Sequence, residues 1–267
     1  MKSPVPYFGG KARLARRIVE MMPEHKIYVE PFGGAMSVLL AKEPSNVEVY
    51  NDLDGEVVNF FRMLQNPKTL TEFLNRAWAS PYSREEYYKC RELIKTTDDP
   101  VEKARCFFVL ARYGFAGHRE SFGISLTRKQ TRSYHNALCN LVHIQERLST
   151  VCIECVDFRK ILNNYDTPDT LFYLDPPYVP ETRKSGVYKN ELTNNDHVEL
   201  VDLLNNMQGK FLLSGYNNDL YNSNGWYKKE YKANCSAAAR TRRNGLQGEG
   251  YCVGQARIEC LWSNFEL

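Results

Sequence analysis

The stretch Leu171-Phe172-Tyr173-Leu174-Asp175-Pro176-Pro177-Tyr178 joins a run of four apolar residues to an acid, two prolines and a tyrosine. The apolar run is typical of a buried strand, and the prolines end it because they lack the N–H that a central strand donates. The acid and the tyrosine are therefore expected just outside the carboxyl end of a strand, where α/β folds place their ligands.

The same four polar and proline residues predict a reaction centre. The prolines hold the backbone extended, so the Pro176 carbonyl is available as an acceptor beside the Asp175 carboxylate. Two acceptors match the two N–H bonds of an amino group on an aromatic ring and hold its nitrogen in line with an electrophile. Tyr178 offers a flat face to a base, and such stacking contributes about 1–3 kcal/mol. We predict that Asp175, Pro176, Pro177 and Tyr178 are catalytic; a plain strand-ending turn is the alternative.

Other short apolar runs, separated by helical patterns, accompany this one and predict an α/β sheet covered by helices on both faces. They are residues 27–30, 47–50, 151–155, 211–214 and 258–262. Residues 55–149 instead show helical periodicity, as in residues 70–78, 85–94 and 100–112, without a convincing strand. We therefore predict a discontinuous catalytic domain of residues 1–54 and 150–267, and an inserted, mostly helical domain of residues 55–149 that carries a hairpin.

A cofactor site is predicted where the first two runs end. Residues Glu30-Pro31-Phe32-Gly33-Gly34-Ala35 follow the first run, and glycines there let the backbone pass close to a ligand. Asp52 ends the second run and is well placed to accept hydrogen bonds from ribose hydroxyls. The dinucleotide pattern G-x-G-x-x-G is absent, so a nucleoside without a pyrophosphate fits better, and S-adenosylmethionine is one.

A glycine-containing segment, Tyr7-Phe8-Gly9-Gly10-Lys11, precedes an expected helix over residues 11–22. It is not a phosphate loop, because Val5 stands where that motif needs glycine and Ala12 where it needs serine or threonine. Lys11 instead suits a ligand carboxylate, with Tyr7 covering it.

Together these segments resemble the Dam-type, class-alpha DNA adenine methyltransferases. That family has W/Y-x-G-G-K, then P-F-x-G, then a target-recognition insertion, then D-P-P-Y, and the resemblance runs nearly end to end. It includes Arg112-Tyr113-Gly114-Phe115-Ala116-Gly117, which is similar to the family's R-Y-G-x-N-G. It implies a Rossmann-like methyltransferase sheet, S-adenosylmethionine as cofactor, and methyl transfer to N6 of a flipped adenine at specific sites in double-stranded DNA.

The resemblance also implies roles for single residues. Tyr7, Lys11 and the main chain at Phe32 and Gly33 are expected to hold the amino-acid part of the cofactor. Asp52 is expected at its ribose, Asp157 and Phe158 near its adenine, and Asp175 at both the cofactor's edge and the target amine. Three departures stand out: Met36 occupies a position where many members have glycine, Ala116 replaces the usual asparagine, and residues 118–123 do not match the segment associated with readers of GATC. The last two departures leave the recognition sequence open.

Basic and aromatic residues predict DNA contacts. Lysines and arginines supply phosphate contacts, arginine reads guanine, and an aromatic wedge fills the gap left by a flipped base. The basic residues form two clusters, one within residues 119–132 and a second within residues 228–243 that includes Lys228, Lys229 and Lys232. Solvated surface charge is the alternative interpretation for either cluster alone. The predicted contacts are Tyr113, Phe115, Arg119, Phe122, Arg128, Lys129, Arg132, Tyr188, Arg240, Arg242 and Arg243.

Composition sets the remaining expectations. A chain of 267 residues with 43% hydrophobic and 25% charged residues is ordinary for a globular protein, and a net charge of +3 says little about partners. Most of its eight cysteines lie in apolar stretches of the sequence, as is typical of reduced cytoplasmic thiols. No metal site and no membrane-spanning segment are expected. We expect a monomer or weak dimer, with a cognate restriction endonuclease as a conceivable cellular partner. The alternatives are methylation of cytosine N4 or of RNA adenine, and a catalytically idle DNA-binding module.

Overall fold

The computed structural model describes residues 1–7, 9–114, 119, 121–123, 130–182, 190–233 and 257–267. These residues form a mixed α/β structure with a seven-stranded sheet, as the alternating strand and helix patterns predict. The chain divides into two compact units, Met1–Ile161 and Leu162–Leu267. The functional division into residues 1–54 with 150–267 and residues 55–149 is a separate prediction and stays one.

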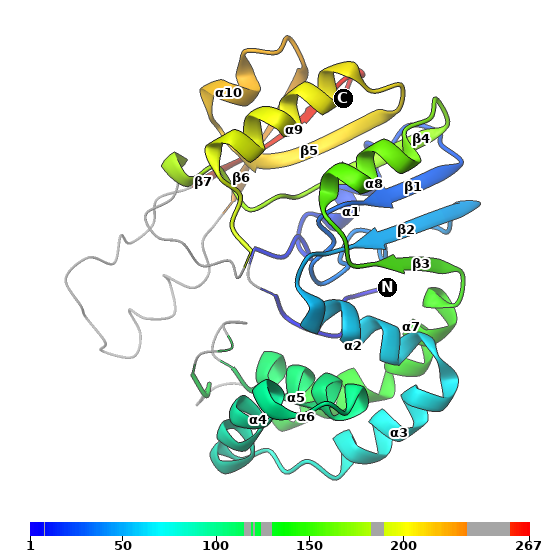
Figure 1. Ribbon diagram of the computed structural model, residues 1–267, viewed down its shortest axis with the longest axis vertical. Coiled ribbons are helices and arrows are strands. Elements are labelled where there is room, and N and C mark those ends of the chain that lie inside the picture. Colours follow the sequence, from blue (N-terminus) through cyan, green and yellow to red (C-terminus); the bar gives the residue numbers. More distant parts are fainter. Residues whose placement is uncertain (8, 115–118, 120, 124–129, 183–189, 234–256) are drawn as a thin grey trace, which may run out of the picture. The chain divides into compact units, whose positions relative to one another are not determined.

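The first unit contains three parallel strands, β1 (Ile27–Glu30), β2 (Val47–Asn51) and β3 (Val151–Glu154), with β2 in the middle (Figure 1). Most residues of β1 and β2 are buried whichever face they point to, as in a parallel sheet covered on both sides. Because parallel strands end at one edge, the residues that follow β1, β2 and β3 come together there.

A short helix, α1 (Ala15–Val19), precedes these strands and is shorter than the predicted helix over residues 11–22. No side chain caps its first turn, since Leu14 occupies the N-cap position, and the preceding residues form turns instead.

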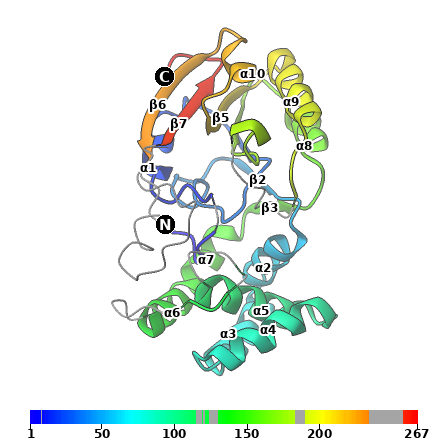
Figure 2. The same cartoon turned by 90° about the vertical axis from the view of Figure 1, so that its left-hand side faces the viewer.

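Between β2 and β3, the described residues of the first unit form six helices, which gather into one block that Figure 2 shows from the side. Four of them have an N-cap residue whose side chain accepts a hydrogen bond from a backbone N–H of the first turn: Asp54, Asn66, Ser83 and Asp99. The helices are α2 (Gly55–Gln65), α3 (Pro67–Trp78), α4 (Arg84–Thr96), α5 (Pro100–Tyr113), α6 (Gln130–Cys139) and α7 (Leu141–Leu148).

Helix α5 is the centre of this block, and α2, α3 and α4 all pack against it. The ring of Phe60 lies 5.3–5.9 Å, centroid to centroid, from those of Phe73, Phe107 and Phe108. All four phenylalanines are fully buried, so this aromatic cluster joins three helices by area burial and ring contact.

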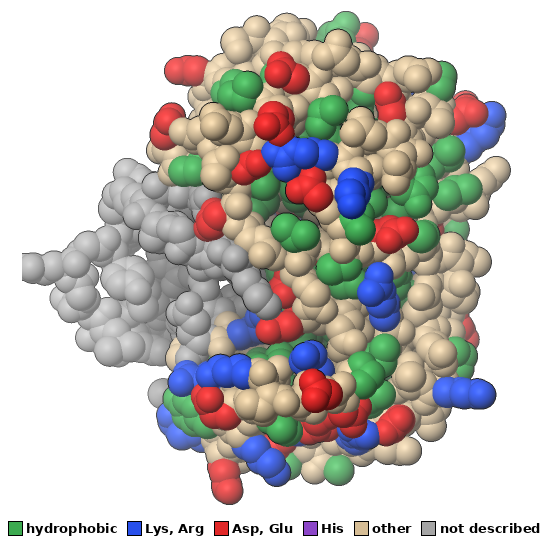
Figure 3. Space-filling view, in the orientation of Figure 1, with side chains coloured by type: hydrophobic (Ala, Val, Ile, Leu, Met, Phe, Trp, Pro, Cys, Tyr) green, Lys and Arg blue, Asp and Glu red, His purple; other side chains and the backbone are tan. Residues whose placement is uncertain are grey.

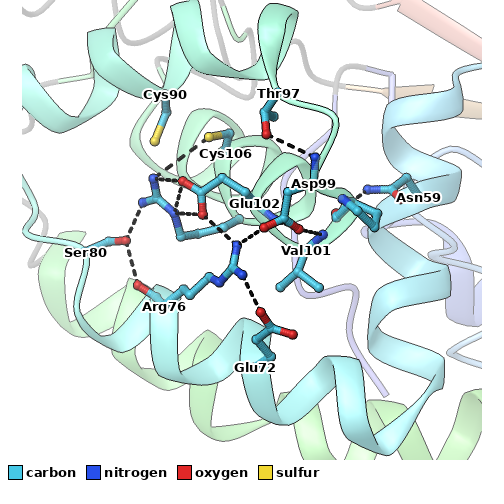
Figure 4. Close-up of polar contacts among 12 residues, drawn as sticks. Asn59, Glu72, Arg76, Ser80, Cys90, Thr97, Asp99, Val101, Glu102 and Cys106 are labelled. Atoms are coloured by element: carbon cyan, nitrogen blue, oxygen red, sulfur yellow. Dashed lines mark hydrogen bonds and ion pairs between the residues drawn. The ribbon is translucent and has the colours of Figure 1, made fainter.

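A network of ion pairs crosses the same helices. Arg105 of α5 is almost buried and pairs with Glu86 of α4 and with Glu102 of its own helix. Arg76 of α3 reaches Asp99 and Glu102, and Figure 4 shows it between these residues and Glu72. The shared carboxylate of Glu102 therefore links α3 and α5 through two arginines.

The second unit contains β4 (Thr170–Leu174), β5 (Lys210–Tyr216), β6 (Tyr227–Ala233) and β7 (Arg257–Ser263). Strands β4 and β5 are parallel, β7 is antiparallel to β5, and β6 is antiparallel to β7. The helices beside them are α9 (Asn194–Asn206), which begins with a capping box, the short α10 (Asp219–Asn222) and the 3₁₀ turn η2 (Pro180–Thr182). Helix α8 (Phe158–Tyr165) starts in the first unit and ends in the second.

Strand β6 was not predicted. The sequence of residues 227–233 shows no alternation of apolar and polar residues and is rich in lysine, so it was interpreted as a basic cluster. It nevertheless pairs with β7 along its whole length. Tertiary pairing therefore overrides local pattern here. Lys228 lies on this strand, pairs with Glu230 at 2.8 Å and sits over the ring of Trp262.

Charged side chains of both signs are interspersed on the face that Figure 3 shows. Within the described part of the chain, no helix is long and apolar enough to cross a membrane.

Candidate active site

The segments that follow β1, β2 and β3 are fastened together by one buried amide, that of Asn51. Its Nδ2 donates to the carbonyls of Pro31 at 2.9 Å and Val156 at 3.0 Å, and its Oδ1 accepts from the Val156 N–H at 2.9 Å. The Asn51 carbonyl accepts from Gly33 N–H at 2.8 Å. The predicted cofactor segments of the first unit are thus brought to one place, which we call the strand-end cluster: Phe32, Gly33, Asn51, Asp52 and Phe158.

Asp52 has the geometry of a carboxylate ready to accept further hydrogen bonds. Its Oδ2 accepts from Gly34 N–H and its Oδ1 from Asp54 N–H, both at 2.8 Å. A carboxylate has about four lone-pair sites, so these two bonds leave acceptor capacity for a ligand. Burial, opposed by these backbone hydrogen bonds and reinforced by the Asp54 charge, raises the pKa of Asp52 to about 6.

The loop after β1 approaches its neighbours closely. A Cβ at Gly33 would lie 2.2 Å from the ring of Tyr50, so only glycine fits there. The Tyr50 hydroxyl donates to the Gly34 carbonyl at 2.7 Å, and the ring of Tyr7 lies against Gly34. Phe32 contacts Phe158 with ring centroids 5.2 Å apart. Four of the predicted cofactor residues, Tyr7, Phe32, Gly33 and Phe158, therefore lie around this loop.

The backbone at Met36 has a conformation that glycine adopts readily. Met36 is fully buried and adopts φ of +57°, the left-handed conformation that costs a residue with a Cβ about 1–2 kcal/mol. The backbone thus keeps the course that glycine would give it, and buried apolar contact offsets the strain.

The remaining two predicted cofactor residues of the first unit lie at the start of helical turns. Lys11 is buried, and its Nζ donates to the Gly9 carbonyl at 3.4 Å. Asp157 accepts from Arg159 N–H at 2.9 Å and pairs with its guanidinium at 3.1 Å, while that guanidinium lies over the Phe158 ring. Phe158 thus contacts both Arg159 and Phe32.

In the second unit, Asp175 directly follows β4, as predicted. The buried Ser214, at the equivalent point of the neighbouring parallel strand β5, donates to Asp175 Oδ1 at 2.8 Å. The Ser214 hydroxyl also lies 3.2 Å from the hydroxyl of Tyr173. A hydrogen bond to a carboxylate fixes the side-chain torsion, so Ser214 sets the direction in which Asp175 points.

Tyr178 is fixed at both ends of its side chain. Its ring meets that of Tyr216 edge to face, with centroids 4.4 Å apart, and its hydroxyl donates to Glu259 Oε2 at 2.7 Å. Tyr216 and Glu259 are register partners on β5 and β7, so one rigid strand pair supplies both contacts. We call Asp175, Tyr178, Ser214, Tyr216 and Glu259 the tetrad cluster.

The residues predicted to contact DNA are placed differently from one another. Tyr113 is fully buried, with its ring against Tyr82 and Tyr134, so its side chain offers no support for a DNA contact. Arg132 is exposed on α6, and Phe122 is partly exposed. Seven predicted contacts lie outside the described residues: Phe115, Arg128, Lys129, Tyr188, Arg240, Arg242 and Arg243.

Arg119 makes protein contacts. Its guanidinium pairs with Glu56 Oε2 at 2.6 Å and Asp54 Oδ2 at 3.0 Å, and lies over the ring of Phe107.

Three residues with positioning contacts were not predicted: Asn51, Ser214 and Glu259. Asn51 directly precedes the predicted Asp52 at the end of β2, which is the signal that the sequence offered for it. Ser214 and Glu259 lie within β5 and β7, far in the sequence from Asp175 and Tyr178, so the sequence offered no such signal for them. No group of three or more histidine, cysteine or acidic side chains is arranged to hold a metal ion in the described ranges.

Comparison with known proteins gives a consistent result. The profile of the D12 class N6 adenine-specific DNA methyltransferase family matches residues 7–235. The DNA adenine methylase of Haemophilus influenzae is 28% identical over 218 residues, which cover 75% of this chain and 73% of that protein. That of Escherichia coli K12 is 24% identical over 234 residues, covering 83% and 82%. That of Salmonella typhimurium is 25% identical over 209 residues, covering 74% of each chain.

Proposed function

The chain belongs to the D12 class N6 adenine-specific DNA methyltransferases, and from this premise we propose how its residues divide the work of methyl transfer. It is a DNA adenine methyltransferase, and its family uses S-adenosylmethionine. The observation that carries the proposal is the tetrad cluster, in which a carboxylate and an aromatic ring are both fixed by neighbouring strands.

We propose that the strand-end cluster binds S-adenosylmethionine, which supplies an electrophilic methyl group. The donor set suits this ligand: Asp52 has acceptor capacity for two ribose hydroxyls, and the buried ammonium of Lys11 suits a carboxylate. Tyr7 and the main chain at Phe32 and Gly33 hold the amino-acid portion, and Asp157 and Phe158 lie at the adenine. The contact of Asp175 with the cofactor's edge is part of the same proposal.

At the tetrad cluster, the Asp175 carboxylate and the Pro176 carbonyl accept the two N–H bonds of the adenine amine. Pulling on both hydrogens localises the nitrogen lone pair, which is otherwise delocalised into the ring, and directs it at the methyl group. Tyr178 stacks on the flipped base, and Pro177 keeps the backbone extended between them. The bound cofactor would supply the methyl group directly to N6 by breaking its sulfonium S–CH3 bond, which leaves S-adenosylhomocysteine, and the proton lost from the amine would pass to solvent.

Double-stranded DNA is the proposed substrate. Basic residues of the two clusters, within residues 119–132 and 228–243, contact phosphates. Aromatic residues fill the gap that the flipped adenine leaves. Among the predicted contacts that the structure describes, Arg132 on α6 is the exposed basic residue, and we assign it a phosphate contact. A cognate restriction endonuclease, the cytoplasmic location and the monomeric state stay predictions.

Methylation of plasmid DNA tests the function directly. The purified chain, S-adenosylmethionine and plasmid from a methylation-deficient host should yield N6-methyladenine by nuclease digestion and mass spectrometry, with positions mapped by single-molecule sequencing. Asp175→Ala should abolish the product while S-adenosylhomocysteine still binds. Methylcytosine as the only product, or full turnover by Asp175→Ala, would contradict the proposal.

A further inference from the structure

We propose that Asn51 is a positioning residue that, together with Tyr50, sets the spacing between the two ends of the cofactor site. It holds the loop after β1, proposed for the amino-acid part of the ligand, against the segment after β3, proposed for its adenine. Asn51 thereby makes the site prefer the whole ligand to its nucleoside half. The inference rests on the proposed function of the strand-end cluster.

The place of Asn51 in the sheet allows this role. Strand β2 pairs with β1 on one side and with β3 on the other, and Asn51 is its last residue. Because the three strands are parallel, the segments that follow β1 and β3 leave the sheet at the same edge, on either side of Asn51. The strand between them thus ends within reach of both.

The side-chain amide of Asn51 uses both of its donor hydrogens on these segments. Its Nδ2 donates to the carbonyls of Pro31 and Val156, at 2.9 and 3.0 Å, and its Oδ1 accepts from Val156 N–H at 2.9 Å. Asn51 is 1% exposed, so these bonds are shielded from water. Turning the amide over would place Oδ1 against two carbonyls and Nδ2 against an N–H, so only the present orientation satisfies all its partners.

These bonds fix a position that ring contact alone leaves loose. Phe32 and Phe158 also touch, with ring centroids 5.2 Å apart. Apolar contact is non-directional, whereas a hydrogen bond weakens steeply as its angle changes. Pro31 directly precedes Phe32, and Val156 lies two residues before Phe158. The Asn51 amide therefore determines how far the amino-acid end of the site lies from its adenine end.

Tyr50, the neighbour of Asn51 on β2, holds the same loop at a second point. Its hydroxyl donates to the Gly34 carbonyl at 2.7 Å, and its buried ring fills the space that a side chain at Gly33 would need. The Asn51 carbonyl also accepts from Gly33 N–H at 2.8 Å. The end of β2 is thus attached to the loop by one hydroxyl, one side-chain amide and one backbone carbonyl.

A ligand that spans both ends gains from a fixed spacing. When two parts of one ligand bind two subsites, the second contact forms at high effective concentration only if the subsites lie at the distance that the ligand spans. A loop that is already in place also avoids the entropy cost of ordering it on binding. A ligand that occupies one end gains from neither effect. Loss of the Asn51 amide should therefore weaken the whole ligand more than its nucleoside half.

Two ligands measure this difference: S-adenosylhomocysteine, which has both parts, and methylthioadenosine, which lacks the amino-acid part. Equilibrium dialysis of the full chain with tritiated S-adenosylhomocysteine, displaced by methylthioadenosine, gives both dissociation constants. In the unmodified chain, S-adenosylhomocysteine should bind about tenfold or more tightly than methylthioadenosine, because its amino-acid part adds charged hydrogen bonds. In Asn51→Ala this ratio should fall to less than about threefold. A variant that is only less well folded loses affinity for both ligands by the same factor and keeps the ratio.

Asn59→Ala is the matched control. The Asn59 amide also donates to a proline carbonyl, that of Pro100 at 2.8 Å, but it joins α2 to α5 within the helical block. Its removal should leave the ratio within about twofold of that of the unmodified chain. Tyr50→Phe removes one hydrogen bond from the loop and keeps the ring, so it should lower the ratio by about two- to threefold.

An undiminished ratio in Asn51→Ala, or an equal loss in Asn59→Ala, would overturn the inference. So would a ratio near one in the unmodified chain, because the site then gains nothing from its amino-acid end. If Asn51→Ala does not fold, Tyr50→Phe decides, and an unchanged ratio in that variant contradicts the proposed spacing. Failure of the proposed function looks different, because neither ligand then binds and plasmid DNA is not methylated.

Discussion

At the scale of single residues, the tetrad cluster depends on hydrogen bonds that reach Asp175 and Tyr178 from neighbouring strands. Ser214 and Glu259 do not meet the adenine in the proposed mechanism, yet each holds a group that does. A reacting carboxylate that is free to rotate spends part of its time misdirected, and small misplacements reduce the rate strongly.

Ser214→Ala should therefore lower kcat roughly 10- to 100-fold, the equivalent of the 1.5–3 kcal/mol typical for a hydrogen bond to a charged group. The KM for S-adenosylmethionine should stay within about twofold, since Ser214 lies outside the strand-end cluster. Steady-state kinetics on plasmid DNA measures both. Ser263→Ala, at a buried serine of β7 whose hydroxyl bonds a backbone carbonyl, is the matched control and should keep wild-type kcat. Equal kinetics for the two variants would contradict the positioning role.

The raised pKa of Asp52 gives a pH dependence. Its folded pKa of about 6 exceeds the ordinary value of an aspartate, so in the ligand-free protein this group adds stability at low pH, and that stability is lost as pH rises through about 6. Ribose hydroxyls need the ionised form as acceptor, so binding has the opposite trend. The affinity for S-adenosylhomocysteine should fall as pH drops below about 6, approaching tenfold per unit.

Calorimetric titration with S-adenosylhomocysteine from about pH 5 to pH 8 tests this trend. Asp52→Asn should bind more weakly at pH 8 and show little change across the range. A flat profile in the unmodified chain would show that Asp52 does not carry the pH dependence.

At the scale of elements, the helical block is held by α5, whose apolar faces meet three helices and whose Arg105 pairs with Glu86 of α4. Arg105→Ala should destabilise the fold by about 3 kcal/mol or more, because it leaves Glu86 and Glu102 largely buried without their shared partner. Denaturant unfolding followed by circular dichroism measures the change. Arg91→Ala, at a half-exposed arginine of α4 that lies over the ring of Tyr88, should shift the free energy of unfolding by less than about 1 kcal/mol. A similarly small shift for Arg105→Ala would contradict the role of the network.

Elements with strong apolar patterns were predictable from the sequence, and those held by tertiary contacts were not. The runs at 27–30, 47–50 and 171–174 became β1, β2 and β4 almost to the residue, because buried parallel strands are apolar on both faces. Strand β6 has no such pattern and forms through its pairing with β7. The helix expected from residue 11 is confirmed only from Ala15, because nothing caps an earlier start.

The same distinction applies to the site. Asp52 and Asp175 were predictable because an acid at the end of an apolar strand has a known chemical use. Asn51, Ser214 and Glu259 act through residues distant in sequence, and only the strand pairing brings them into contact. Arg119 was predicted as a phosphate contact, since sequence alone does not show that Asp54 and Glu56 lie beside it.

At the scale of the whole molecule, the net charge of +3 is too small to attract DNA by itself, so binding must depend on local basic residues. Each phosphate contact releases counterions, and with about six contacts the Kd for DNA should rise about 1,000-fold between 50 and 200 mM salt. Arg132→Gln should reduce the slope of log Kd against log salt by about one. Fluorescence anisotropy with a labelled duplex measures both. An unchanged slope would place Arg132 outside the interface.

Strand β6 is an edge strand, since β7 is its sole partner among the described strands. Outermost strands expose unpaired N–H and C=O groups that can recruit another chain into a continuous sheet. The charged side chains of Lys228, Lys229 and Glu230 stand on this strand, and lysine on an edge opposes such stacking between copies. Lys228 and Lys229, which the sequence suggested for DNA contact, thus also oppose edge-to-edge association between copies of this enzyme.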